Sequence, residues 1–360
     1  MNLETVGWNL FFEEHFYHYK NKGLLPGRVL GKNKEIYTIT DGDKTFYGKL
    51  SGKFRYKINL SKDFPAVGDW VVFQTKENSP FVYIQAVLPR KSYFSRKQPI
   101  SGGRKIKNGV IVGGSTEEQI IASNIDKVLI IGGLDGDFDI RRIERYVTLA
   151  YNSGAVPIII LNKVDLCEEV DLYIEQVRSV ALGIPILTVS AEKNINMSSL
   201  LGHIHSADTI ALLGSSGVGK STITNFLLGE EIQRKQTISK ATGKGKHTTT
   251  SAELLIHPLG YMIIDTPGLR EVQLWGEEDI LEESFKDVIA FLGKCKYSNC
   301  NHQTESGCAI KEAIKDGMIS EKRFESYQNQ FDELYKLNKK RTQLDIQMSK
   351  KQKQRKLFRF

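Results

Sequence analysis

The chain has 360 residues, more than one hydrophobic core ordinarily supports, so two or three domains are expected. Hydrophobic residues make up 40% and charged residues 26%, which excludes a fibrous protein and a largely disordered one. The net charge is +8, and residues 333–360 hold ten basic and two acidic side chains, so the rest of the chain is balanced. A basic tail on a neutral body favours a polyanion, either a nucleic acid or a membrane surface.

The sequence gives no sign of a membrane or secreted protein. No apolar run reaches the roughly 20 residues needed to cross a bilayer, and residues 1–20 mix acidic and histidine side chains with aromatics, unlike a signal peptide. Four cysteines are too few for a disulfide scaffold in a chain of this length. We therefore expect a cytoplasmic protein with no membrane-spanning segment.

The first part of the chain is expected to be a helix followed by a small β-barrel. Residues 6–19 are aromatic-rich and predict a helix that packs on the barrel. Short β-prone runs then follow, separated by Gly, Asp, Asn and Pro, at 27–30, 36–40, 45–49, 69–74 and 83–88. Five strands in about 85 residues match the size of an OB-fold.

A basic stretch follows at residues 90–107, with seven basic side chains and no acidic one. Tyr93 and Phe94 lie among the cations, a composition that suits base stacking beside phosphate contacts. We expect a loop between two domains that binds RNA. Residues 234–246 and 333–360 are further basic stretches with the same expected role.

The middle of the chain predicts an α/β domain. Strand-like runs at 127–132, 157–162, 184–189 and 209–214 alternate with helix-like runs at 140–151, 170–182 and 197–205. This alternation is typical of a parallel sheet with helices on both faces. Two more strands, 252–257 and 261–265, and a helix at 278–292 follow, and a polar helix runs from Glu321 into the basic tail.

The run 209–214 leads into a phosphate-loop motif, G-x-x-x-x-G-K-[ST], which reads Gly214-Ser215-Ser216-Gly217-Val218-Gly219-Lys220-Ser221. Its glycines allow backbone N–H groups to turn towards phosphates, and the following helix adds positive charge at its N-terminus. Lys220 is expected to reach the outer phosphates and assist catalysis, and Ser221 to ligate Mg²⁺. Thr222 is expected beside the nucleotide.

The run 157–161 leads into Asn162-Lys163-Val164-Asp165, which matches the guanine-specific motif N-K-x-D. Asp165 can accept two hydrogen bonds from the guanine ring N–H and amino group, a pair that adenine lacks. Asn162 is expected to support the loop, and the stem of Lys163 to lie along the ring face. Ser190-Ala191-Glu192-Lys193 is expected to be the companion loop, with Ser190 and Ala191 beside the base.

The order of these motifs indicates a circular permutation, because N-K-x-D precedes the phosphate loop here and follows it in ordinary GTPases. Asp265-Thr266-Pro267-Gly268 matches D-x-x-G; Asp265 would hold Mg²⁺ through water and the Gly268 N–H would meet the γ-phosphate. Between the phosphate loop and D-x-x-G lies Lys246-His247-Thr248-Thr249-Thr250. One of its threonines would complete the coordination of Mg²⁺. We take Thr249 and Thr250 as the candidates.

Three cysteines and a histidine cluster near the C-terminus in the spacing Cys295-x4-Cys300-x-His302-x5-Cys308. Three thiolates and one imidazole form a closed tetrahedral set, which predicts one structural Zn²⁺. The alternative is three free thiols beside a chance histidine. Cys167 stands apart and is expected to be a small packing residue.

These motifs, in this order, resemble the RsgA (YjeQ) family of circularly permuted small ribosomal subunit biogenesis GTPases. The resemblance covers nearly the whole chain. It implies an OB-fold domain at 1–112, a permuted GTPase domain at 113–285 and a helical zinc domain with a basic tail at 286–360. It also implies binding of GTP and GDP, a 30S subunit and 16S rRNA partner, ribosome-stimulated hydrolysis, and action late in 30S maturation. We expect a monomer without a membrane partner, because a GTPase core with an OB-like domain points to rRNA as the polyanion.

Many GTPases place a glutamine after D-x-x-G to orient the attacking water, and this chain has Leu269 there. Because leucine cannot orient water, intrinsic hydrolysis is expected to be slow. His247 is the candidate replacement, and its alternative role is that of a solvated or rRNA-binding loop residue. Two other functions stay open: a GTPase of the large subunit or another RNA, and an RNA-binding module with negligible turnover.

Overall fold

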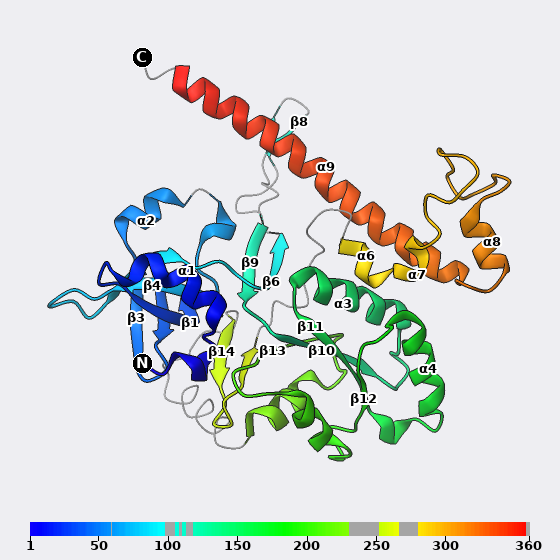
Figure 1. Cartoon of the computed structure of the whole chain (residues 1–360), viewed down its shortest axis with the longest axis horizontal. Coiled ribbons are helices and arrows are strands. Elements are labelled where there is room, and N and C mark those ends of the chain that lie inside the picture. The colour runs from blue at the N-terminus through cyan, green and yellow to red at the C-terminus, as the bar shows by residue number, and fades with distance from the viewer. Residues whose placement is uncertain are drawn as a thin grey trace.

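The computed structural model describes residues 1–58, 60–97, 105–107, 110–112, 118–229, 252–265 and 280–357. A barrel, a central sheet with helices, and a C-terminal group of helices follow one another along the chain (Figure 1). None of the helices in these ranges is long and apolar enough to span a bilayer.

The N-terminal strands close into the expected barrel. They are β1 (Leu25–Asn33), β2 (Ile36–Thr40), β3 (Thr45–Leu50), β4 (Trp70–Gln74) and β5 (Val82–Val87). Strand β1 pairs with β2 on one side and with β4 on the other, and β3 and β5 complete the circle. The interior is filled by alternate residues of these strands, namely Val29, Tyr37, Ile39, Val71, Phe73, Val82 and Ile84.

The aromatic N-terminal segment packs on the outside of this barrel, as the sequence predicts. Helix α1 (Leu10–Lys20) begins after Asn9, whose side chain accepts a hydrogen bond from the Phe11 N–H. Phe12 and Phe16, one helical turn apart, are buried. The Trp8 ring, just before the helix, lies edge-on to Trp70 of the barrel at 4.7 Å.

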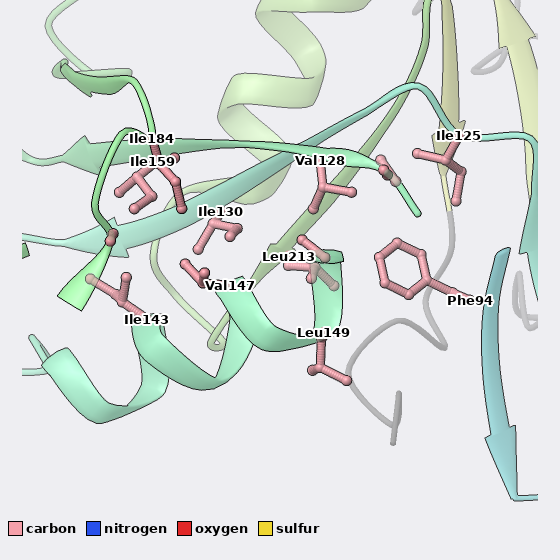
Figure 2. Close-up of a cluster of buried hydrophobic side chains, with 14 of the residues drawn as sticks. Phe94, Ile125, Val128, Ile130, Ile143, Val147, Leu149, Ile159, Ile184 and Leu213 are labelled. Atoms are coloured by element: carbon pink, nitrogen blue, oxygen red, sulfur yellow. The ribbon is translucent and has the colours of Figure 1, made fainter. Parts of the chain in front are cut away.

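The basic stretch 90–107 is not a simple loop, so that prediction was wrong in part. Strand β6 (Tyr93–Lys97) pairs with β9 (Glu118–Ser123), and β7 (Lys105–Lys107) pairs with β8 (Val110–Val112). Because strand side chains alternate, Phe94 points into the core, where Figure 2 shows it beside Leu149, and it is buried. A buried ring cannot stack on an RNA base, whereas Tyr93 is 40% exposed.

The central sheet has the strand order β12 (Ile186–Thr188), β11 (Val156–Asn162), β10 (Lys127–Gly133), β13 (Thr209–Gly214), β15 (Met262–Asp265) and β14 (Glu253–Ile256). The first five strands in this order, from β12 at one edge to β15, are parallel to one another. The sixth, β14, runs antiparallel to β15. Strand β12 is shorter than the predicted run 184–189. At its start, Pro185 has no N–H to donate to the ladder, although its carbonyl accepts from the Ile159 N–H at 2.9 Å.

Both faces of this sheet are covered, which explains why its strands are almost wholly apolar. Along β10, Val128 and Ile130 face helix α3 (Ile140–Ser153), where Ile143 and Val147 meet them (Figure 2). The alternate residues of β10 belong to the core on the other face. That face is covered by helical residues 220–229 and by Met197–His203, which forms a 3-10 helix. Helix α4 (Val170–Val180) lies on the α3 side.

The C-terminal part consists of α6 (Ile280–Ser284), α7 (Lys286–Ile289), α8 (Ala309–Lys315) and the long α9 (Glu321–Leu357). The helix predicted at 278–292 is interrupted at Phe285, because the Ser284 carbonyl accepts a hydrogen bond from Arg323 at 2.5 Å. Figure 1 shows α9 passing over α3. Two ion pairs join these helices, Glu144 with Arg323 and Arg145 with Glu333.

One buried guanidinium joins the barrel to the central sheet. Arg28 on β1 is 1% exposed and donates to the carbonyls of Val6 (2.6 Å) and Asn124 (3.0 Å) and to the Thr209 hydroxyl (2.8 Å). Burial lowers the pKa of Arg28 to about 10, so the group stays charged at neutral pH. A Cβ on Gly7 would lie 2.5 Å from Arg28 Nη1, so glycine is required for this approach.

Candidate functional site

The predicted nucleotide loops meet at the carboxyl ends of the strands of the central sheet. Gly133 pairs with Asn162 and Ile131 pairs with Gly214, so β10, β11 and β13 end side by side. The chain proceeds from β10 through β11 to one side and from β13 to β15 on the other, which makes this the switch point of the sheet. In open α/β sheets, ligands bind at the carboxyl ends of the strands at such a point.

Asn162 joins three of the predicted motifs. Its side chain is buried, donates from Nδ2 to the Val218 carbonyl of the phosphate loop at 2.8 Å, and accepts at Oδ1 from the Ala191 N–H at 2.9 Å. A Cβ on Gly219 would lie 2.2 Å from Asn162 Nδ2, and the φ of Gly219 is +97°. The second motif glycine is therefore required by the contact with Asn162 and by the backbone itself.

The phosphate loop lies between strand β13 and a helix, as its sequence predicts. Residues 220–229 are helical, so the loop leads directly into a helix N-terminus. Lys220 folds back over the loop and donates to the carbonyls of Gly214 (2.8 Å) and Ser215. Ser221 and Thr222 are exposed in the first helical turn, where a phosphate or a metal ion can reach them. Ser216 and Gly217 form the exposed tip of the loop.

The two predicted base loops lie against each other. The Val164 N–H donates to the Val189 carbonyl at 3.2 Å, which joins the loop of N-K-x-D to the loop that begins at Ser190. Ser190 is buried, and its hydroxyl accepts from the Lys193 N–H at 3.1 Å. Asp165 is exposed, so its carboxylate is accessible to a ligand.

Sequence reasoning missed an acidic turn beside these loops. Asp135 forms an ion pair with Lys163, which lowers the pKa of the Asp135 carboxyl. Asp137 accepts from Arg142 at 2.7 Å and from the Ser215 hydroxyl at 2.8 Å, and these hydrogen bonds lower its pKa. The signal was available, because Leu134-Asp135-Gly136-Asp137 directly follows a parallel strand, as the predicted motifs do.

The predicted catalytic histidine and Mg²⁺ ligands lie only partly within the described part of the chain. His247, Thr249, Thr250 and Gly268 lie outside the described residues. Asp265 ends β15 in an exposed position, and β15 pairs with β13 up to Ile264. Asp265 therefore lies at the same sheet edge as the phosphate loop.

The structure brings the predicted metal ligands together. The ligand atoms of Cys295, Cys300, His302 and Cys308 all lie within 4.8 Å of one another. His302 Nδ1 is 3.4–3.7 Å from the three sulfurs, and the sulfurs of Cys295 and Cys308 are 4.0 Å apart. With Zn–S near 2.3 Å, two sulfurs of a tetrahedral site lie about 3.8 Å apart. The set therefore fits a tetrahedral metal ion, and Cys167 lies elsewhere, packed against the core.

The loop that carries these ligands is held by hydrogen bonds of its own. Glu305 accepts from the N–H groups of Asn301 (2.9 Å), Gln303 (2.9 Å) and Thr304 (3.0 Å), which lowers its pKa to about 2. The His302 ring meets Phe324 of α9 edge-on at 5.6 Å. The cluster is thus tied to the long helix that packs on α3.

Comparison with known proteins identifies the family. The model of the RsgA GTPase family matches residues 87–275. A small ribosomal subunit biogenesis GTPase RsgA of Syntrophotalea carbinolica is 40% identical over 93% of this chain and 90% of its own length. The chain belongs to the RsgA GTPase family. An RsgA of Leptospira interrogans is also 40% identical, over 97% of this chain and 95% of its own.

Solved structures agree with the RsgA fold. YjeQ from Thermotoga maritima is 26% identical, with a TM-score of 0.61 over 87% of this chain and 99% of its own. YloQ, described as a circularly permuted GTPase, is 23% identical and has a TM-score of 0.57. The match covers 89% of this chain and 98% of YloQ, which supports the fold. A second family model, described as 50S ribosome-binding GTPase, also matches this chain, at residues 209–342. This RsgA-family protein is therefore a GTP hydrolase with a permuted GTPase domain.

Proposed function

We propose that this protein binds the 30S ribosomal subunit through its 16S rRNA and acts late in small-subunit maturation, as a cytoplasmic monomer. It hydrolyses GTP to GDP and phosphate, and the subunit stimulates this reaction. The observation that carries the proposal is the contact of Asn162 with both the phosphate loop and the Ala191 loop, since it joins a guanine motif to a phosphate site. The names of the relatives supply the small subunit as partner.

In the proposed nucleotide complex, each motif binds a different part of GTP. Asp165 would accept from the guanine ring N–H and amino group, with Lys163 along the ring face and the Ser190 and Ala191 loop at its edge. The phosphate loop, 214–221, would bind the phosphates through its N–H groups and Lys220. Ser221, Asp265 and a threonine of 248–250 would hold Mg²⁺, and the Gly268 N–H would meet the γ-phosphate. Thr222 would contact the nucleotide.

We also propose three domains, at 1–112, 113–285 and 286–360, the last held by one structural Zn²⁺. Zinc suits three sulfurs and one nitrogen at tetrahedral spacing, and the closed set leaves no position for a substrate. The ion would stabilise the folded loop that carries its ligands and would take no part in GTP hydrolysis.

A GTPase assay with 30S subunits, 50S subunits or neither tests the proposal. We expect a large increase with 30S alone, and loss of that increase in His247→Ala with GTP binding intact, because His247 would orient the attacking water. Stimulation by 50S alone would instead favour the large subunit, and no turnover in any arm would indicate a passive RNA-binding module. A fully stimulated His247→Ala variant would exclude that histidine from catalysis.

The barrel offers a surface for single-stranded RNA that the sequence did not single out. Tyr56 is 90% exposed on helix α2 (Gly52–Lys57), and Tyr47 on the adjacent β3 is 59% exposed. Lys53, Arg55 and Lys57 are exposed around them. Exposed rings among cations bind RNA by stacking on bases beside neutralised phosphates.

We therefore expect Tyr56→Ala to weaken the binding of 16S rRNA fragments about tenfold, since one stacked base contributes about 1–3 kcal/mol. Filter binding at fixed salt measures this effect. Tyr17→Ala is the matched control, because Tyr17 is 65% exposed on α1 but follows Glu13 and Glu14. Equal affinity of the Tyr56 variant and the control would remove Tyr56 from the RNA surface.

A further inference from the structure

We propose that Asp135 is a positioning residue of the guanine site, which acts by holding Lys163 of N-K-x-D in place. The inference rests on the proposed function, because it takes residues 162–165 to be the guanine-recognition loop. Asp135 belongs to the acidic turn, defined here as residues 134–137, which lies outside the nucleotide motifs named above.

Lys163 needs a partner to stay where it is. Its backbone has a φ of +68°, a left-handed conformation that a non-glycine residue rarely adopts. Its ammonium pairs with Asp135 Oδ2, and both side chains are only about one quarter exposed, 27% and 26%. A lysine stem can lie along an apolar ring while its charged end stays in a polar environment beyond that ring. Asp135 fixes this charged end.

The position of Asp135 is itself fixed on two sides. Asp135 Oδ1 accepts from the Asp137 N–H at 3.1 Å, and the Leu134 N–H donates to the Asn162 carbonyl at 2.8 Å. Asp137 in turn accepts from Ser215 of the phosphate loop and from Arg142 of α3. The acidic turn therefore connects the base loop, the phosphate loop and α3. A side chain held in this way adds affinity by reducing the ordering that binding requires.

The test is a double-mutant cycle on the affinity for a fluorescent GDP analogue, with thermal melting to check folding. Asp135→Asn keeps the shape and removes the charge, and we expect it to weaken GDP binding about three- to tenfold, as for a partly shielded, charge-assisted hydrogen bond. In a Lys163→Met background, the same substitution should change the affinity less than about twofold. If Asp135→Asn does not fold, Asp135→Ser serves in its place.

Glu169→Gln is the matched control, because Glu169 is an exposed acid before α4 whose side chain makes no capping hydrogen bond. This variant should bind the GDP analogue with the affinity of the wild type. Unchanged affinity in Asp135→Asn would overturn the inference. An equal loss in the wild-type and Lys163→Met backgrounds would overturn it too, since Asp135 would then act on its own. A wild-type chain that fails to bind GDP would instead overturn the proposed function.

Discussion

Replacement of Arg28 by methionine is expected to lower the free energy of unfolding by about 3–5 kcal/mol, because the buried carbonyls of Val6 and Asn124 and the Thr209 hydroxyl would each lose a charged donor. Methionine fills a similar volume, so the loss would come from unpaired acceptors rather than from a cavity. Urea denaturation followed by tryptophan fluorescence is a suitable measurement, since Trp70 lies 5.8 Å from the guanidinium.

Arg55→Met is the matched control for this change. Arg55 is on the same barrel, but its side chain is 63% exposed and pairs with an exposed Glu35. The stability should change by less than about 1 kcal/mol, as for other surface ion pairs. Equal urea midpoints for the two variants would contradict the role we give Arg28 in holding the barrel to the sheet.

Loss of the metal is the second large effect that we expect. Cys308→Ser should reduce bound zinc from about one equivalent per chain to near zero, because a closed site needs all four ligands. Cys308 is buried and directly precedes helix α8. Residues 293–310 should therefore lose their protection from hydrogen exchange. Metal content and exchange in the purified full-length chain measure both effects.

Cys167→Ser separates loss of the site from loss of a thiol, since Cys167 lies outside the cluster and should leave the zinc content unchanged. Chelation of the wild-type chain should reproduce the exchange pattern of Cys308→Ser. Wild-type protein purified in the presence of zinc but without bound metal would refute the assignment of the cluster.

The phosphate loop, N-K-x-D and the loop at Ser190 could be located from the sequence because each is a short run at the end of an apolar strand-like run. The 2.8 Å contact of Asn162 with Val218 joins residues far apart in the chain, so the sequence suggested a supporting role but no partner. Phe94 was misplaced because its neighbours are basic, and only the pairing of β6 with β9 turns it inward. Asp135 carries no motif, and its role depends on Lys163 coming close in space.

The pairing of β14 with β1 has a consequence for the solubility of the chain. Gly31 pairs with Glu253, so the barrel lies along the outer edge of the central sheet. At the opposite edge, β12 is very short, and the Asn196 side chain donates to its Thr188 carbonyl at 3.3 Å. Long unpaired edges promote aggregation by strand addition. The barrel therefore occupies part of this edge, and we expect a fragment without the barrel to expose β14 to other copies.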